Sequence, residues 1–210
     1  MRQVYGYKRG MTRLFGENGD SIAVTAIEVK PCRVIQVKTE EKDGYNALQL
    51  GFGERRKTLF TKPQLGHFGD LEPARHLRET RLDSPTELKR GDAVAADVFK
   101  PGDRVDVTGI SKGLGFQGGV RRHGFGGGPK THGQSDRWRA PGSVGASSYP
   151  SRTFKGQRMA GRMGNRQVTV RNLNVVEVRA DEGLIFVQGA VPGKPNTVIS
   201  IRETKKKQRL

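Results

Sequence analysis

The sequence of 210 residues is poor in cysteine and in hydrophobic side chains, with one cysteine and 33% hydrophobic residues. One cysteine excludes an internal disulfide and a zinc site built on several cysteines. Cys32 follows Pro31 just before an apolar strand pattern, which favours a core side chain over a nucleophile. No stretch approaches the ~18 apolar residues of a membrane span, and the N-terminus has no signal-peptide run. We therefore expect a reducing, intracellular compartment.

Acidic residues are also scarce, 21 against 38 lysines and arginines, which gives a net charge of +17. Self-repulsion of this size opposes a compact state, so a polyanionic partner is the simplest explanation. The sequence pI of about 10.5 lies above the ~9 that marks nucleic-acid-binding domains. A protein that is merely very soluble is the alternative, but the charge is clustered along the chain, which argues against it.

Short segments with a hydrophobic period of two are separated by turns rich in glycine and proline. The strands that this pattern predicts are residues 21–29, 33–39, 45–52, 93–99, 104–110, 168–178, 184–191 and 197–201. Residues 40–44 end in Asp-Gly and predict a hairpin turn between two of these strands. The whole set favours a mainly β protein built on a small, mostly antiparallel barrel.

A polar and basic surface arm is expected over about residues 53–92. Pro73 suits a first helical turn, and residues 74–81 can continue that helix. A further short turn of helix is expected at residues 84–91. The last residues, 204–210, predict a frayed basic tail.

Residues 111–168 are unusual because they show no sustained strand or helix period. They contain 14 of the 29 glycines, 11 lysines or arginines and a single acid, Asp136, so their net charge is +10. Irregular loops longer than ~12–15 residues are usually functional or disordered. Strand patterns lie on both sides, so we expect a long excursion from one barrel domain made of residues 1–110 and 169–210.

Planar side chains alternate with the basic residues of this excursion. The planar ones are Phe116, His123, Phe125, Trp138, Tyr149 and Phe154. Folded RNA is bound through phosphate contacts and through stacking on aromatic and guanidinium planes. Glycine permits close backbone approach, and arginine suits bidentate phosphate contacts. The pattern predicts an extended arm that becomes ordered when RNA folds around it; a disordered basic linker is the alternative.

Signals for other functions are incomplete. Gly113 to Gly118 match G-x-G-x-x-G after a predicted strand, but a dinucleotide site also needs a helix at this point. We do not expect residues 119–129 to form one. His123 and His132 lie nine residues apart without neighbouring cysteines or carboxylates, so no metal site is expected. No catalytic pair is visible, and we expect neither an enzyme nor a cofactor.

Several motifs resemble a known family. They are G-x-K-x-G-M-T-x-x-F at residues 6–15, K-P and G-H-F within 62–68, D-V-T-G at 106–109, S-K-G and G-F within 111–116, T-H-G at 131–133, P-G-S-V-G at 141–145, F-K-G at 154–156, M-A-G and M-G within 159–164, and G-A-V-P-G at 189–193. Over nearly the whole chain they resemble the bacterial form of the universal large-subunit ribosomal protein L3 family. Leu114 departs from this pattern because many relatives carry lysine there, and Ala146 because some carry glutamine.

The resemblance implies a six-stranded barrel whose long loop runs inward through ribosomal RNA toward the peptidyl transferase centre. It implies an early-binding assembly protein that contacts large-subunit ribosomal RNA and neighbouring ribosomal proteins in the cytoplasmic ribosome. It implies no membrane partner, no small-molecule substrate and no catalytic residue. The loop would be residues 111–168, with its tip near residues 143–152.

Composition and resemblance together give a set of expected RNA contacts. These are Lys8, Arg9, Lys62, His67, Lys112, Phe116, Arg121, Arg122, His123, Lys130, His132, Arg137, Trp138, Arg139, Ser143, Tyr149, Arg152, Lys155, Arg158, Arg162 and Arg166. Two other functions stay open. A general nucleic-acid chaperone or chromatin-type binder would hold duplex DNA as well as RNA, and a nucleotide-dependent enzyme would be stabilised by a nucleotide.

Overall fold

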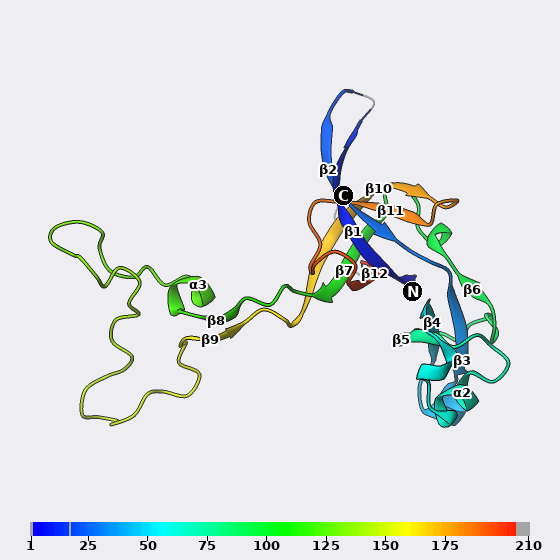
Figure 1. The fold of residues 1–210 in the computed structure, drawn as a ribbon, viewed down its shortest axis with the longest axis horizontal. Coiled ribbons are helices and arrows are strands. Elements are labelled where there is room, and N and C mark those ends of the chain that lie inside the picture. The colour runs from blue at the N-terminus through cyan, green and yellow to red at the C-terminus, as the bar shows by residue number, and fades with distance from the viewer. Residues whose placement is uncertain (1, 17, 205–210) are drawn as a thin grey trace. The chain divides into compact units, whose positions relative to one another are not determined.

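The structure is a computed structural model that describes residues 2–16 and 18–204. The expected basic tail therefore lies outside the described residues, apart from Thr204. The chain divides into two compact units, which we call the barrel unit (Met1–Ile110 and Gln167–Leu210) and the insertion (Ser111–Arg166). Figure 1 follows the order of the elements by colour.

Six strands of the barrel unit close on themselves. They are β1 (Gln3–Phe15), β2 (Ser21–Glu28), β7 (Arg104–Ile110), β10 (Gln167–Arg179), β11 (Leu184–Gln188) and β12 (Val198–Glu203). Their order around the barrel is β1-β12-β7-β10-β11-β2, and every neighbouring pair is antiparallel. The expected mainly β fold with a six-stranded antiparallel barrel is confirmed. Strand β1 was not among the strands predicted from the sequence.

Alternation along these strands explains why the barrel forms. In β12, Ile199 and Ile201 are buried between less buried neighbours, and in β7 Val105 and Val107 point to the same interior. Burying side chains of this size stabilises a fold by about 1.5–3 kcal/mol each. Closure also leaves the barrel itself without a free sheet edge that could pair with another chain.

A second sheet lies outside the barrel in the same unit. It has the order β5-β4-β3-β6 and consists of β3 (Cys32–Lys38), β4 (Ala47–Glu54), β5 (Ala74–Arg81) and β6 (Ala93–Val94). The helix expected at residues 74–81 is wrong, because these residues form β5. Their side chains favour a helix, but pairing along the whole of β4, from Ala47↔Arg81 to Glu54↔Ala74, overrides that local preference.

Other local expectations differ from the structure only in part. The expected hairpin is confirmed, because β3 and β4 pair antiparallel on either side of residues 40–44. Its connection contains one helical turn, α1 (Glu40–Asp43), which Gly44 ends with a φ of 76°. Residues 84–91 contain no helix, and the strand expected at 93–99 stops at Val94, before the 3-10 turn η2 (Ala96–Val98). Packing against the barrel core explains this stop, since Ala96 and Phe99 are buried there.

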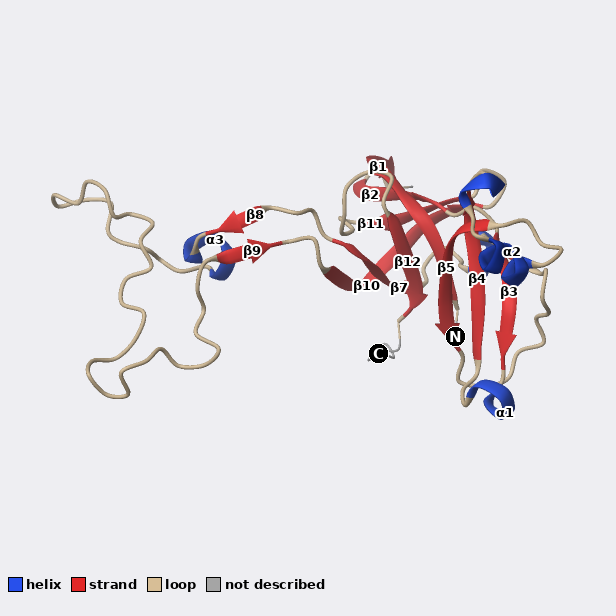
Figure 2. Cartoon of the chain, turned by 60° about the horizontal axis from the view of Figure 1, so that its bottom comes forward, coloured by secondary structure: helices blue, strands red, loops and turns tan. Residues whose placement is uncertain are grey.

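The turns between β4 and β5 were not expected either. They are the 3-10 turn η1 (Lys57–Leu59) and helix α2 (Lys62–Phe68). Pro63 lies in the first turn of α2, and the Gln64 side chain accepts a hydrogen bond from the backbone N–H of Thr61 at 3.0 Å. Such a cap satisfies an N–H that would otherwise lack a partner. Figure 2 shows how short the helices are beside the strands, and none of the described helices is long and apolar enough to cross a membrane.

Cys32 belongs to the core, as expected. It is fully buried in a cluster under the second sheet that includes Tyr5, Val34, Leu50 and Phe52. Burial raises the pKa of its thiol to about 11, because the thiolate would lose its hydration. The thiol therefore stays protonated near neutral pH, and thiolate is the reactive form.

We predict that Cys32 does not react with a thiol reagent at pH 7 in the folded protein. In denaturant, where burial is lost, it should react at the rate of an ordinary cysteine. Labelling with an absorbing disulfide reagent would check this. Rapid labelling of the folded chain would contradict the buried position.

A second prediction concerns the barrel core. Replacing the fully buried Ile201 by alanine should lower the free energy of unfolding by about 2–5 kcal/mol, because it leaves a cavity. Ile110→Ala is a matched control, since Ile110 lies in the adjacent strand β7 but is 50% exposed, and it should cost under ~1 kcal/mol. Urea unfolding measures both. Equal losses would contradict the assigned core.

Candidate nucleic-acid interface

The insertion begins and ends as a narrow two-stranded ribbon. Strand β8 (Gly115–Gln117) pairs with β9 (Gly161–Met163), and the backbone N–H of Leu114 donates to the Met163 carbonyl at 3.0 Å. Gly164 has a φ of 77°, and a side chain on it would collide with the Lys112 carbonyl oxygen. Glycine at this point therefore lets the outgoing and returning chains run side by side.

A short helix follows β8 where none was expected. Helix α3 (Gly119–His123) is ended by Gly124, whose φ is 74°. The expectation that these residues cannot form a helix is wrong. Glycines that flank five helical residues permit one turn and a half, too little for the helix that a dinucleotide site needs after G-x-G-x-x-G.

Two of the expected RNA contacts hold the insertion together internally. Arg122 Nη1 donates to the Met159 carbonyl oxygen at 2.7 Å, and His123 Nε2 lies 3.0 Å from the same oxygen. His123 also packs against Phe125, with 5.7 Å between the ring centres. These two side chains therefore join α3 to the chain that leads into β9.

Large aromatic side chains of the insertion are open to solvent. Phe116 is 77% exposed and Tyr149 is 90% exposed, and Trp138 and Phe154 are exposed as well. The indole N–H of Trp138 donates to the Gln134 carbonyl at 3.2 Å. Exposed flat rings of this size are available to stack on unpaired bases.

The positive charge of the insertion is not compensated internally. Its expected basic contacts other than Arg122 are all exposed: Lys112, Arg121, Lys130, Arg137, Arg139, Arg152, Lys155, Arg158, Arg162 and Arg166. Within the described residues, no salt bridge involves a residue of the insertion. His132 and Ser143 are exposed too, with the Ser143 hydroxyl donating to the Gly145 carbonyl at 2.9 Å. The arrangement offers guanidinium and ammonium groups beside flat rings.

The expected contacts outside the insertion have partners in the barrel unit. Lys8 Nζ donates to the carbonyl oxygens of Val191 at 2.8 Å and Gly193 at 3.0 Å. Arg9 pairs with Glu28 at 2.5 Å. These bonds fix the loop before β12 and the β1–β2 pair, which is a structural role.

The remaining two expected contacts lie on α2. Lys62 is exposed at its start, and His67 Nε2 lies 2.5 Å from Gln49 Oε1 on β4. The helix is thereby attached to the second sheet. An RNA contact by either side chain stays a prediction.

A further basic group was missed by reasoning from the sequence. Arg55 and Arg56 follow β4, and Arg75 and His76 lie on β5, where they line one cavity. The signal present in the sequence was the run of three basic residues at 55–57, but nothing indicated that β5 lies beside it. No three of the described His, Cys, Asp and Glu side chains are grouped so that they could hold a metal ion.

The fold and the charge define a class of protein, a basic β-barrel protein with an uncompensated glycine- and arginine-rich insertion. The family model described as "Ribosomal protein L3" matches residues 80–183. The curated "Large ribosomal subunit protein uL3" of Chloroherpeton thalassium is 53% identical over 208 residues, 98% of this chain and 100% of the relative. That of Chlorobaculum parvum is 53% identical over 209 residues, with 98% and 100% covered. That of Brachyspira hyodysenteriae is 45% identical over 207 residues, with 98% and 95% covered.

The chain belongs to the ribosomal protein L3 family, in its bacterial form. These matches cover 98% of the chain, so both units fall largely within the matched region.

Trp138 provides a test of the exposed rings. Trp138→Ala should weaken RNA binding by about 1–3 kcal/mol if a base stacks on the indole, whereas Trp138→Phe should keep most of the affinity. Filter binding to ribosomal RNA measures both. Unchanged affinity of the alanine variant would mean that the indole packs only on protein.

Proposed function

We propose that this protein is a structural constituent of the large ribosomal subunit that binds ribosomal RNA. It supports early subunit assembly, and its insertion buttresses the region of the peptidyl transferase centre. The observation that carries this proposal is the insertion itself, which has a net charge of +10, no internal salt bridge among the described residues, and exposed aromatic rings.

Physical chemistry supports an RNA partner. Each phosphate that a lysine or arginine neutralises releases counterions, which favours binding and makes it sensitive to salt. Flat rings between the cations add stacking on unpaired bases, which duplex DNA does not offer. The names of the relatives, which describe large-subunit proteins, support the same partner.

The length of the insertion supports a contact far from the barrel. About 29 residues run in each direction, and at ~3.3 Å per residue a fully extended chain would cover at most about 100 Å. We propose that residues 143–152 form the inner tip, and that the barrel unit contacts neighbouring ribosomal proteins. The protein would then act in the cytoplasmic ribosome without a catalytic group.

Affinity for large-subunit ribosomal RNA and for duplex DNA of equal length, measured over ~50–200 mM salt, tests the proposal. Contact with 6–10 phosphates should lower duplex affinity by ~10³–10⁵ over this range, with a shallower slope for single strands. Preference for ribosomal RNA should persist at the highest salt, because stacking and shape are less sensitive to screening. Equal binding of the two at every salt would identify a general polyanion binder.

The register of the barrel permits deletion of the whole insertion without changing the strand pairing. Ile110 of β7 and Gln167 of β10 are paired neighbours, so a short Asn-Gly turn can join the two strands directly. We expect this deletion variant to unfold cooperatively near the wild-type temperature but to fail in assembling large subunits. Sedimentation of subunits from cells that carry only the variant gives the readout. Normal subunits would contradict a role for the insertion.

A further inference from the structure

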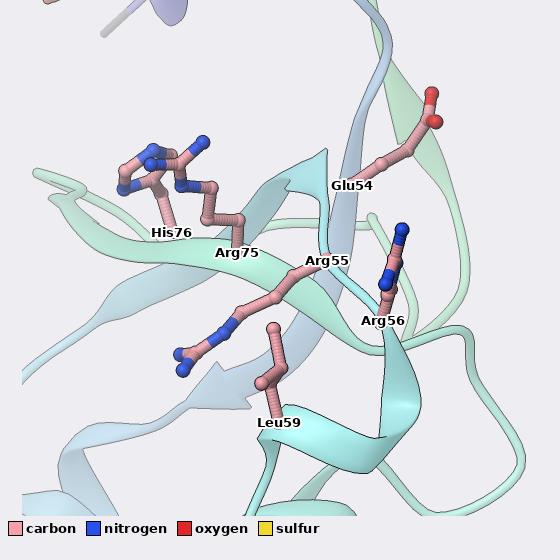
Figure 3. Close-up of a pocket in the computed structure, with 6 residues that line it drawn as sticks. All are labelled: Glu54, Arg55, Arg56, Leu59, Arg75 and His76. Carbon is pink, nitrogen blue, oxygen red and sulfur yellow. The ribbon is translucent and has the colours of Figure 1, made fainter.

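An open cavity of about 880 Å³ lies on the second sheet, in the barrel unit. It is lined by Glu54, Arg55, Arg56, Leu59, Arg75 and His76, as Figure 3 shows. The lining comes from the end of β4, the turn η1 and the start of β5. The register of β4 and β5 pairs Glu54 with Ala74 and Phe52 with His76, which brings the two groups of basic residues together.

The three arginines of the cavity have no acidic partners among the described residues. Within the described part of the chain, no salt bridge involves Arg55, Arg56 or Arg75, and all three are exposed. Glu54 is the one acid in the lining, and it pairs with Lys30 at 3.5 Å. Its carboxylate points away from the Arg55 guanidinium in Figure 3. The cavity therefore presents concentrated, uncompensated positive charge.

Aromatic rings fix one wall of the cavity. Tyr5 stacks on Phe52 with 5.3 Å between ring centres and a 5° angle between planes, and Phe52 lies 5.3 Å from the His76 ring. Tyr7 contacts the same imidazole at 6.3 Å. Tyr5 and Phe52 are buried, so this chain of rings leads from the core to the half-buried imidazole at the cavity.

A second pair of rings supports the Arg55 side chain. Arg55 Cζ lies 5.1 Å from the centre of the Phe60 ring, a cation–π contact. Phe60 in turn packs edge-on against the buried Phe68 of α2 at 5.8 Å. This contact restricts the Arg55 side chain, which reduces the conformational entropy lost on binding.

Gly53 makes close packing around His76 and Arg75 possible. Its φ is 76°, and a Cβ there would collide with the Tyr7 hydroxyl and lie 3.4 Å from His76 Cδ2 and 3.5 Å from Arg75 Cβ. A larger residue would have to displace side chains that support or line the cavity. The site is therefore built by tight packing as well as by exposed arginines.

The chemistry of the lining fits a nucleotide. Guanidinium groups bind phosphate oxygens in bidentate geometry, which an isolated ammonium cannot do. Burial lowers the pKa of His76, as do Arg75 and Arg78, so the imidazole is uncharged near neutral pH. A neutral flat ring stacks on a base, and Leu59, 56% exposed, offers an apolar contact to a ribose or base.

We propose that this cavity is a second RNA-binding site, which takes the phosphodiester backbone of a single-stranded RNA segment on Arg55, Arg56 and Arg75 and stacks an unpaired base on His76. The inference rests on the proposed function and adds a contact that does not involve the insertion. An acidic peptide would also satisfy the arginines, but it needs an aromatic residue next to its acids to cover the imidazole. Every nucleotide combines a phosphate with a flat base, so RNA is the favoured occupant.

Charge substitutions in the full-length chain test the site against ribosomal RNA. The cavity variant carries Arg55→Gln, Arg56→Gln and Arg75→Gln. Its control carries Arg13→Gln, Arg104→Gln and Arg171→Gln, which are exposed arginines of the same unit without salt bridges among the described residues. Both variants lose three charges, so long-range electrostatics fall equally.

The cavity variant should lose at least about ten times more affinity than the control. The slope of log affinity against log salt should become shallower by about 2, because each of the three lost single-strand phosphate contacts contributes ~0.7. Equal losses in both variants, with wild-type preference for ribosomal RNA over DNA intact, would overturn this inference alone. Loss of that preference in the wild type would overturn the proposed function and this inference with it. Circular dichroism confirms that both variants are folded.

Site-directed crosslinking tests the same cavity without removing charge. Leu59→Cys introduces an exposed thiol at the cavity, and Cys32 is buried, so a photoreactive label attaches selectively. Met11→Cys is the control, with 54% exposure against 56% for Leu59. The Leu59 variant should crosslink to one continuous ribosomal RNA segment in assembled subunits. Scattered RNA crosslinks like those of the control, or crosslinks to a neighbouring protein, would overturn the proposal.

Discussion

The pairing of β7 with β10 is the contact on which both units depend. Residues Gln167↔Ile110 to Asn174↔Arg104 are register partners, so the chain leaves the barrel and returns to it at adjacent points. The barrel is thereby closed as though a short turn joined the two strands. Because loop-closure entropy grows only slowly with length, a long insertion at this point costs the barrel little. The barrel can therefore close without a contribution from the insertion.

The two units also differ in how their charge is balanced. Twenty of the 21 acids lie outside the insertion. Some of them pair with cations there, as Asp103 and Glu203 do with Arg2, and Glu79 does with Lys38. A hydrogen bond from Lys38 is the main reason that the pKa of Glu79 lies below its usual value. Exposed pairs of this kind stabilise a fold only slightly. Their larger effect is that the barrel unit repels itself less than its cation count suggests, whereas no salt bridge among the described residues offsets the charge of the insertion.

Features that depend on the local pattern of residues could be predicted from the sequence. Period-two alternation identified five of the six barrel strands, and the absence of any period marked the insertion. Residues 74–81 were wrongly predicted to be helical. Their side chains favour a helix, but pairing with β4, which lies twenty or more residues earlier in the chain, outweighs that preference. The arginine cavity was missed for the same reason, since only the β4–β5 register brings Arg55 beside Arg75. Long-range pairing is what a single sequence does not display.

The place of β12 in the chain has a consequence for synthesis. Its partner β1 pairs as Gln3↔Arg202, so the barrel cannot close until nearly all of the described chain has left the ribosome that makes it. The sheet of β3, β4 and β5 needs only residues 32–81 and can form earlier. The insertion, translated before β10, β11 and β12, emerges while its own barrel is still open. The arginines of the insertion are therefore exposed during synthesis before the barrel that carries the insertion is complete.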